Sequence, residues 1–135
     1  MSPVEARWGR ARAAARLGQL EEALTLGEAL AAEDPTQHDY YFGFLGVVAA
    51  QLGDRARARE ILNQLAADFR PYTLGEPQFQ AGRIAAVLGD FERATELLAS
   101  AQRQAYPYDM EFHRDHTMAR LHGLPILREL DARRE

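Results

Sequence analysis

The sequence contains no cysteine and no long apolar run. Without cysteine, disulfide bonds, thiolate zinc sites and cysteine nucleophiles are excluded. The longest apolar stretch lies around residues 44–50, far short of the roughly 18 consecutive apolar residues that a membrane span needs. Charged residues such as Glu5, Arg7 and Arg10 interrupt the N-terminal segment, which therefore lacks the apolar core of a secretory signal. We accordingly expect no membrane partner and a cytoplasmic location.

The chain also lacks an excess of positive charge. Its 16 basic residues, all of them arginine, are outnumbered by 20 acidic residues, and the formal net charge is −4. That sign is opposite to the basic footprint of a nucleic-acid binder, so we predict no nucleic-acid partner. The sequence has no glycine-rich phosphate loop, nucleophile elbow or Ser/His/Asp signature. We therefore predict that the protein is not an enzyme and needs no cofactor.

What the sequence does contain is an internal repeat. The pattern A-A-x-L-G-x-x-x-x-A occurs three times, as AARLGQLEEA at 14–23, AAQLGDRARA at 49–58 and AAVLGDFERA at 85–94. The second copy begins 35 residues after the first, and the third begins 36 residues after the second. A nearly constant period of this length is the signature of a repeat architecture.

Each copy of the repeat predicts two antiparallel helices joined by a tight turn. Gly18, Gly53 and Gly89 can adopt the left-handed conformation that closes a helix. Asp54 and Asp90 are suitable N-caps for the helices that follow. The alanine five residues after each glycine would let the two helices of a pair approach closely. On these signals we predict helices at about 3–17, 20–33, 38–52, 55–68, 77–88 and 91–104.

These residues resemble the tetratricopeptide repeat family, whose unit of about 34 residues combines an aromatic residue, a Leu-Gly pair and small residues at set positions. The second repeat matches best and supplies Phe42, Leu45 and Gly46. In the first and third repeats, Arg7 and Gln78 stand where the aromatic residue is expected. The resemblance implies an all-α fold, a right-handed α-solenoid of antiparallel helix pairs.

We expect a single domain over residues 1–135, with three repeats at about 3–35, 38–70 and 76–106. The strict pattern then ends, but Gly123 lies one period after Gly89, so a degenerate fourth pair is expected at about 109–134. This pair is interpreted as the cap that covers the last apolar face of the array. Gly27 replaces a large apolar residue, which predicts that the first repeat is the least stable. The connector at 70–76 is predicted to be a hinge.

In the resembled family, the first helix of each pair lines a concave groove that receives an extended segment or a helix of a partner. By position, this groove would combine aromatic and arginine side chains, which are enriched at binding hot spots. For Trp8 and Phe79, packing in the core between repeats fits equally well. The resemblance thus implies a scaffold or adaptor for a protein or peptide partner. The predicted groove residues are Trp8, Arg12, Arg16, Tyr40, Val47, Gln51, Phe79 and Arg83.

Two other functions stay open. An incomplete first repeat or the atypical fourth pair could dock on another copy, which would make the protein a self-assembling homo-oligomer. His113 and His116, with Asp109 one turn earlier, would share a helical face and are the best candidates for a metal-dependent activity. Two imidazoles need at least a third ligand, and a capping helix explains them more simply. We therefore predict no metal site.

Overall fold

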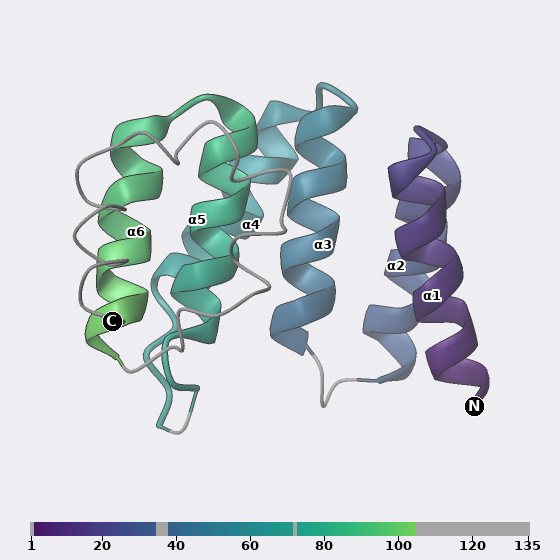
Figure 1. The fold of residues 1–135 in the computed structure, drawn as a ribbon, viewed down its shortest axis with the longest axis horizontal. Helices are drawn as coiled ribbons and strands as arrows, with labels where there is room; N and C mark the ends of the chain where they lie inside the picture. The colour runs from purple at the N-terminus through teal and green to yellow at the C-terminus, as the bar shows by residue number, and fades with distance from the viewer. Residues whose placement is uncertain (1, 35–37, 72, 105–135) are drawn as a thin grey trace, which may run out of the picture.

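The computed structural model describes residues 2–34, 38–71 and 73–104, and within these ranges it contains helices and no strand (Figure 1). The helices are α1 (Pro3–Arg16), α2 (Leu20–Glu33), α3 (His38–Gln51), α4 (Arg55–Ala66), α5 (Glu76–Leu88) and α6 (Phe91–Arg103). The predicted all-α fold and all six predicted helices are confirmed. The largest difference is at the end of α4, which was expected at residue 68 and is observed at Ala66. The predicted capping pair at 109–134 lies outside the described residues.

The turn within each pair is built as the repeat predicts. Gly18, Gly53 and Gly89 have φ angles of +79°, +88° and +83°, in the left-handed region that favours glycine. Asp54 and Asp90 each accept a hydrogen bond of 3.2 Å from the backbone N–H three residues later, and so cap α4 and α6. These caps satisfy backbone donors that a helix start otherwise leaves without a partner.

Glycine brings α3 close against α5. A β-carbon added at Gly46 would lie 2.7 Å from Cγ1 of Ile84 and 3.2 Å from Cγ2 of Ile61. One added at Gly43 would lie 2.8 Å from Cβ of Gln80. Since non-bonded carbon atoms prefer separations of about 3.5–4.0 Å, only glycine fits here without a shift of its neighbours. This close approach ties the second pair to the third.

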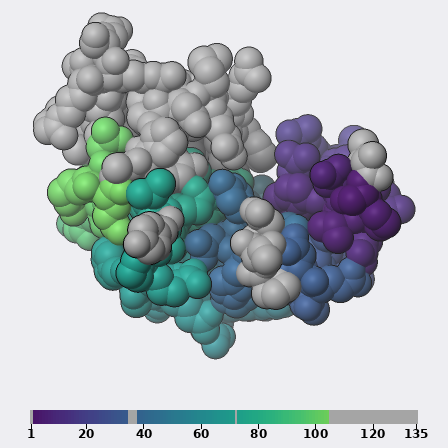
Figure 2. All heavy atoms as spheres, turned by 90° about the horizontal axis from the view of Figure 1, so that it is seen from below, coloured from purple at the N-terminus to yellow at the C-terminus, as the bar shows by residue number. Residues whose placement is uncertain are grey.

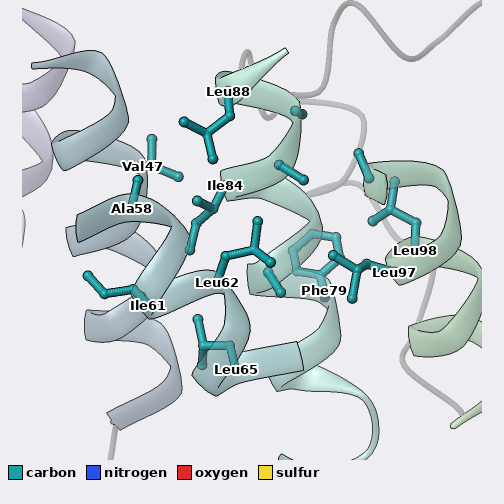
Figure 3. Close-up of a cluster of buried hydrophobic side chains, with 14 of the residues drawn as sticks. Val47, Ala58, Ile61, Leu62, Leu65, Phe79, Ile84, Leu88, Leu97 and Leu98 are labelled. Carbon is teal, nitrogen blue, oxygen red and sulfur yellow. The ribbon is translucent and has the colours of Figure 1, made fainter. Parts of the chain in front are cut away.

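The buried side chains form two clusters. The smaller one joins the first pair to α3 and includes Ala11, Leu30 and Val48. Side chains of α2 such as Leu24 and Ala31 pack against both clusters, so α2 links the first pair to the rest of the array. The larger cluster lies among α3, α4, α5 and α6, and Figure 3 labels its members Val47, Ala58, Ile61, Leu62, Leu65, Phe79, Ile84, Leu88, Leu97 and Leu98.

Gly27 in α2 has a packing explanation. A β-carbon at this position would lie 3.0 Å from Cδ2 of Leu45 and 3.0 Å from Cδ1 of Phe44. These two α3 side chains occupy the space that a large residue at position 27 would need. The second pair thus supplies apolar bulk that the first pair lacks.

The pairs stand side by side in chain order, with α1 and α2 at one end and α6 at the other (Figure 1). In the space-filling view of Figure 2, the purple atoms of the first pair lie next to the blue atoms of the second. Polar contacts also link the pairs: Arg57 of α4 bonds Glu28 of α2 at 3.1 Å, and Nη2 of Arg55 donates to the carbonyl oxygen of Leu88 at 3.0 Å. None of the described helices has the length and apolar character needed to cross a bilayer.

Candidate partner-binding surface

Trp8 anchors α1 to α3. Its ring meets Tyr41 and Phe44 edge to face, with ring centroids 5.2 and 5.1 Å away and interplanar angles of 78° and 77°. Such pairs stabilise by about 0.5–1.5 kcal/mol each beyond the area they bury. The hydroxyl of Tyr41 in turn donates a hydrogen bond of 3.0 Å to Asp34 after α2. Trp8 is half-buried, so it packs in the core and still leaves part of its ring at the surface.

Arg12 and Arg16 follow Trp8 along α1 at intervals of four residues. The guanidinium carbon of Arg12 lies 5.3 Å from the centre of the Trp8 ring, within the range of a cation–π interaction. Both arginines are exposed, and neither forms an ion pair with a carboxylate in residues 2–34, 38–71 or 73–104. This part of α1 therefore presents two cationic groups beside an aromatic ring.

The charges of the first pair are segregated by helix. α1 contains four arginines and one glutamate, whereas α2 contains four glutamates and no basic residue. Within the described ranges, Arg7 is the α1 arginine that pairs with an α2 acid, Glu33, while Glu28 of α2 pairs with Arg57 of α4. The carboxylate of Glu5 accepts a hydrogen bond from the N-cap backbone of its own helix. The α1 surface beyond Trp8 is therefore positive, although the whole chain is negative.

α3 contributes the neighbouring surface. Tyr40 is 40% exposed near the start of α3, and Gln51 is exposed at its end. Between them, Phe44 lies against Trp8, and Val47 is only 5% exposed and belongs to the larger core cluster. Val47 thus offers no open surface, contrary to the prediction that it lines a groove, because its side chain is used in packing α3 against the neighbouring helices.

The predicted groove residues of α5 are less exposed than Arg12 and Arg16 of α1. Phe79 is 2% exposed and lies inside the larger cluster (Figure 3), so of its two interpretations the core is the one observed. Arg83 is partly buried, and its Nη1 donates a hydrogen bond of 2.8 Å to Oε1 of Gln80. Nε2 of Gln80 donates in turn to Oε1 of Glu76 at 2.7 Å. Arg83 is therefore positioned by polar side chains of its own helix, which the sequence patterns did not reveal.

Gln78 performs a structural role that the repeat pattern did not predict. Its completely buried Nε2 donates to the carbonyl oxygens of Leu65, Ala66 and Asp68, at 3.4, 3.3 and 2.7 Å. Its Oε1 accepts a hydrogen bond of 2.9 Å from Gln104 after α6. Carbonyl groups at the end of a helix lack partners within that helix. Gln78 supplies a donor to Ala66 and Asp68, whereas the carbonyl of Leu65 also accepts from the backbone N–H of Asp68. The signal in the sequence was a glutamine at a position where the repeat expects an aromatic residue.

A second polar cluster joins the connector after α4 to the start of α3. Nη2 of Arg70 donates to Asp68 at 2.6 Å and to Asp39 at 3.3 Å. The hydrogen bonds from Arg70 lower the pKa of Asp68. Burial raises the pKa of Asp39, against the opposing attraction of Arg70. The segment predicted as a hinge thus contacts α3 through Arg70 and Asp39. That the segment acts as a hinge stays a prediction.

No arrangement of three or more His, Asp or Glu side chains suited to a metal ion occurs in the part of the chain that the structure describes. Asp109, His113 and His116 lie outside that part. The described helices therefore test neither the prediction of no metal site nor the alternative of a metal-dependent activity at these residues.

Antiparallel helix pairs joined by glycine turns and stacked in chain order define a helical repeat array. Residues 4–29 and 41–64, which cover most of the first and second pairs, match the model of the tetratricopeptide repeat family. These matches support the resemblance to that family that the repeats of the sequence predicted. Comparison with curated proteins and with solved structures gave no match. Tetratricopeptide repeats generally mediate protein–protein interactions and are typically not enzymatic.

Proposed function

We propose that the protein is a scaffold or adaptor that holds a segment of another polypeptide on exposed and partly exposed side chains of α1, α3 and α5. The stacking of the exposed Arg12 on Trp8 carries this proposal. Arginine and tryptophan are the residues most enriched among those that dominate binding energy. We call the proposed surface the first-helix face, and its members are Trp8, Arg12, Arg16, Tyr40, Gln51 and Arg83.

The ring of Trp8 is suited to binding because it is already held in place. Tyr41 and Phe44 contact it edge to face, and the exposed Arg12 lies over the ring at 5.3 Å from its centre. A side chain that is ordered before the partner arrives loses little rotamer entropy on binding. More of the interaction energy is then available as affinity.

The length of the α3 part of the face sets the size of the partner segment. Tyr40 and Gln51 are separated by about 16 Å along the helix at a rise of 1.5 Å per residue. An extended peptide advances about 3.3 Å per residue, so about five residues cover this distance. We therefore expect a short linear segment to be the unit that binds.

Site-specific cross-linking in cells of the source organism tests this proposal. A photo-reactive benzoyl side chain is placed at position 51, in place of Gln51 on the first-helix face. The control places it at position 64, in place of Gln64, which is also exposed but lies on α4. We expect a polypeptide adduct from position 51 and none from position 64. Equal adducts from both positions, or an adduct from position 64 alone, would contradict the proposal.

The segregated charges of the first pair favour a second candidate function, self-assembly, in which the arginines of α1 meet the glutamates of α2 in another copy. Sedimentation at micromolar concentration tests it. A dimer that dissociates as salt is raised would support self-assembly. A single species at 15.2 kDa, the mass of one chain, would remove it.

A further inference from the structure

We infer that the segment held on the first-helix face is acidic and that Arg12 and Arg16 select it by charge. This inference rests on the function proposed above and adds the chemical class of the partner. The inference begins from two positive charges on α1 that no described acid neutralises. Two exposed arginines have no carboxylate partner among the described residues, although the adjacent helix α2 carries four glutamates.

Three acids of the first pair are already engaged. Glu33 binds Arg7, and Glu28 binds Arg57 of α4. Glu5 lies on α1 itself, where its carboxylate takes part in the capping box. None of the three pairs with Arg12 or Arg16. Within residues 2–34, 38–71 and 73–104, both cations thus keep their charge available to the carboxylates of a partner.

The spacing of Arg12 and Arg16 fits an extended acidic segment. Residues four apart on a helix face are separated by about 6 Å along its axis, and like charges at that spacing repel each other. Alternate residues of an extended strand point to the same side and lie about 6.6 Å apart. Two acids at alternate positions, separated by one residue, would thus each meet one arginine. Their binding would also remove the repulsion between the two cations.

The negative charge of the whole chain does not oppose this selection strongly. At physiological ionic strength, charges more than about 8 Å apart are largely screened. A peptide carboxylate beside Arg12 therefore responds mainly to the charges around it, which are the arginines of α1. Trp8, Arg12 and Arg16 are spaced by four residues and so follow one face of α1, whereas Arg10 lies two residues from both Trp8 and Arg12 and belongs to a different face. Arg10 can therefore serve as a control on the same helix.

Peptide selection tests the inference. Random 12-residue peptides displayed on phage are selected against three immobilised proteins: the wild type, the variant R12E/R16E and the control R10E/R59E. Arg10 and Arg59 are exposed and, like Arg12 and Arg16, pair with no acid in the described ranges. Both double variants change the net charge equally, and circular dichroism verifies that each is folded.

We expect the wild type and R10E/R59E to enrich peptides with two acids at alternate positions, and R12E/R16E to lose them. The best peptide, synthesised with a fluorescent label, should bind R12E/R16E at least about tenfold more weakly than wild type and R10E/R59E within about twofold. Enriched peptides without acids would overturn the inference but leave the proposed function standing, as would equal loss in both variants. Enrichment of no peptide by the wild type would overturn both.

Discussion

Replacing Gly46 by alanine tests the close packing of α3 on α5, which holds the second and third pairs together. The added β-carbon would lie 2.7 Å from Cγ1 of Ile84 and closer still to its Cδ1. Ile84 is completely buried, so it has no open space to move into. The substitution therefore crowds the core at the junction between repeats.

Two effects oppose each other in this variant. Alanine is about 1 kcal/mol more favourable than glycine inside a helix. An extra methyl group in a well-packed core costs about 1–3 kcal/mol. Gly9 of α1 provides the matched control, because no atom lies within 4 Å of the place where its β-carbon would be. Gly46→Ala should thus be less stable than Gly9→Ala by about 1–3 kcal/mol, while Gly9→Ala should gain up to about 1 kcal/mol over wild type.

Urea unfolding followed by far-ultraviolet circular dichroism measures these free energies. Ile84→Val removes Cδ1, the atom nearest to the added carbon. The double variant Gly46→Ala/Ile84→Val should therefore be less destabilised than the sum of the two single variants. If Gly46→Ala stabilised the protein as much as Gly9→Ala, the described contact between α3 and α5 would be refuted.

Three further predictions concern the polar and aromatic contacts. Gln78→Ala removes the buried donor that the carbonyl oxygens of Ala66 and Asp68 share, so the free energy of unfolding in urea should fall by about 1–3 kcal/mol, whereas the exposed Gln64→Ala should change it by less than about 0.5 kcal/mol. Because Arg70 lowers the pKa of Asp68 in the folded protein, this carboxylate stabilises the fold above its unfolded pKa and stops doing so as pH falls through the folded value. Asp68→Asn should therefore lower Tm at neutral pH, and the two proteins should converge below pH 3.8, the ordinary value for the group; a constant difference in Tm would contradict the pairing. Trp8→Ala removes the ring that joins α1 to α3, so the amides of α1 and α2 should exchange hydrogen at least about tenfold faster while those of α5 and α6 keep their protection, and a uniform loss of protection would argue against this role.

The helices and turns could be predicted because their signals are local. Gly53 followed by Asp54 ends one helix and caps the next whatever lies around them, and the same holds for Gly89 and Asp90. The repeat also locates the places where the two helices of a pair approach closely, at the completely buried Ala23, Ala58 and Ala94. Local signals at a constant period therefore specify this fold class almost completely.

The surface could be predicted only in part, because exposure depends on neighbours that are distant in the sequence. Counting back from a glycine assigns Val47 and Phe79 to a helix face, but it does not say whether another helix covers that face. The role of Gln78 depends on carbonyl groups at and just after the end of α4, which lie 10–13 residues away in the sequence. No periodic pattern relates those carbonyl groups to Gln78. The pairing of Arg70 with Asp39 is non-local for the same reason.

The most direct test of a first-helix face that holds a polypeptide uses Trp8, the only tryptophan of the chain, as a reporter. A tryptophan-free peptide, taken from the cross-linked partner or from the selection, is titrated into the protein, and its dissociation constant is measured independently by calorimetry. Binding on this face predicts a saturable change in Trp8 emission that follows the calorimetric curve. Calorimetric binding with no change in Trp8 emission would place the partner elsewhere on the protein and contradict the account.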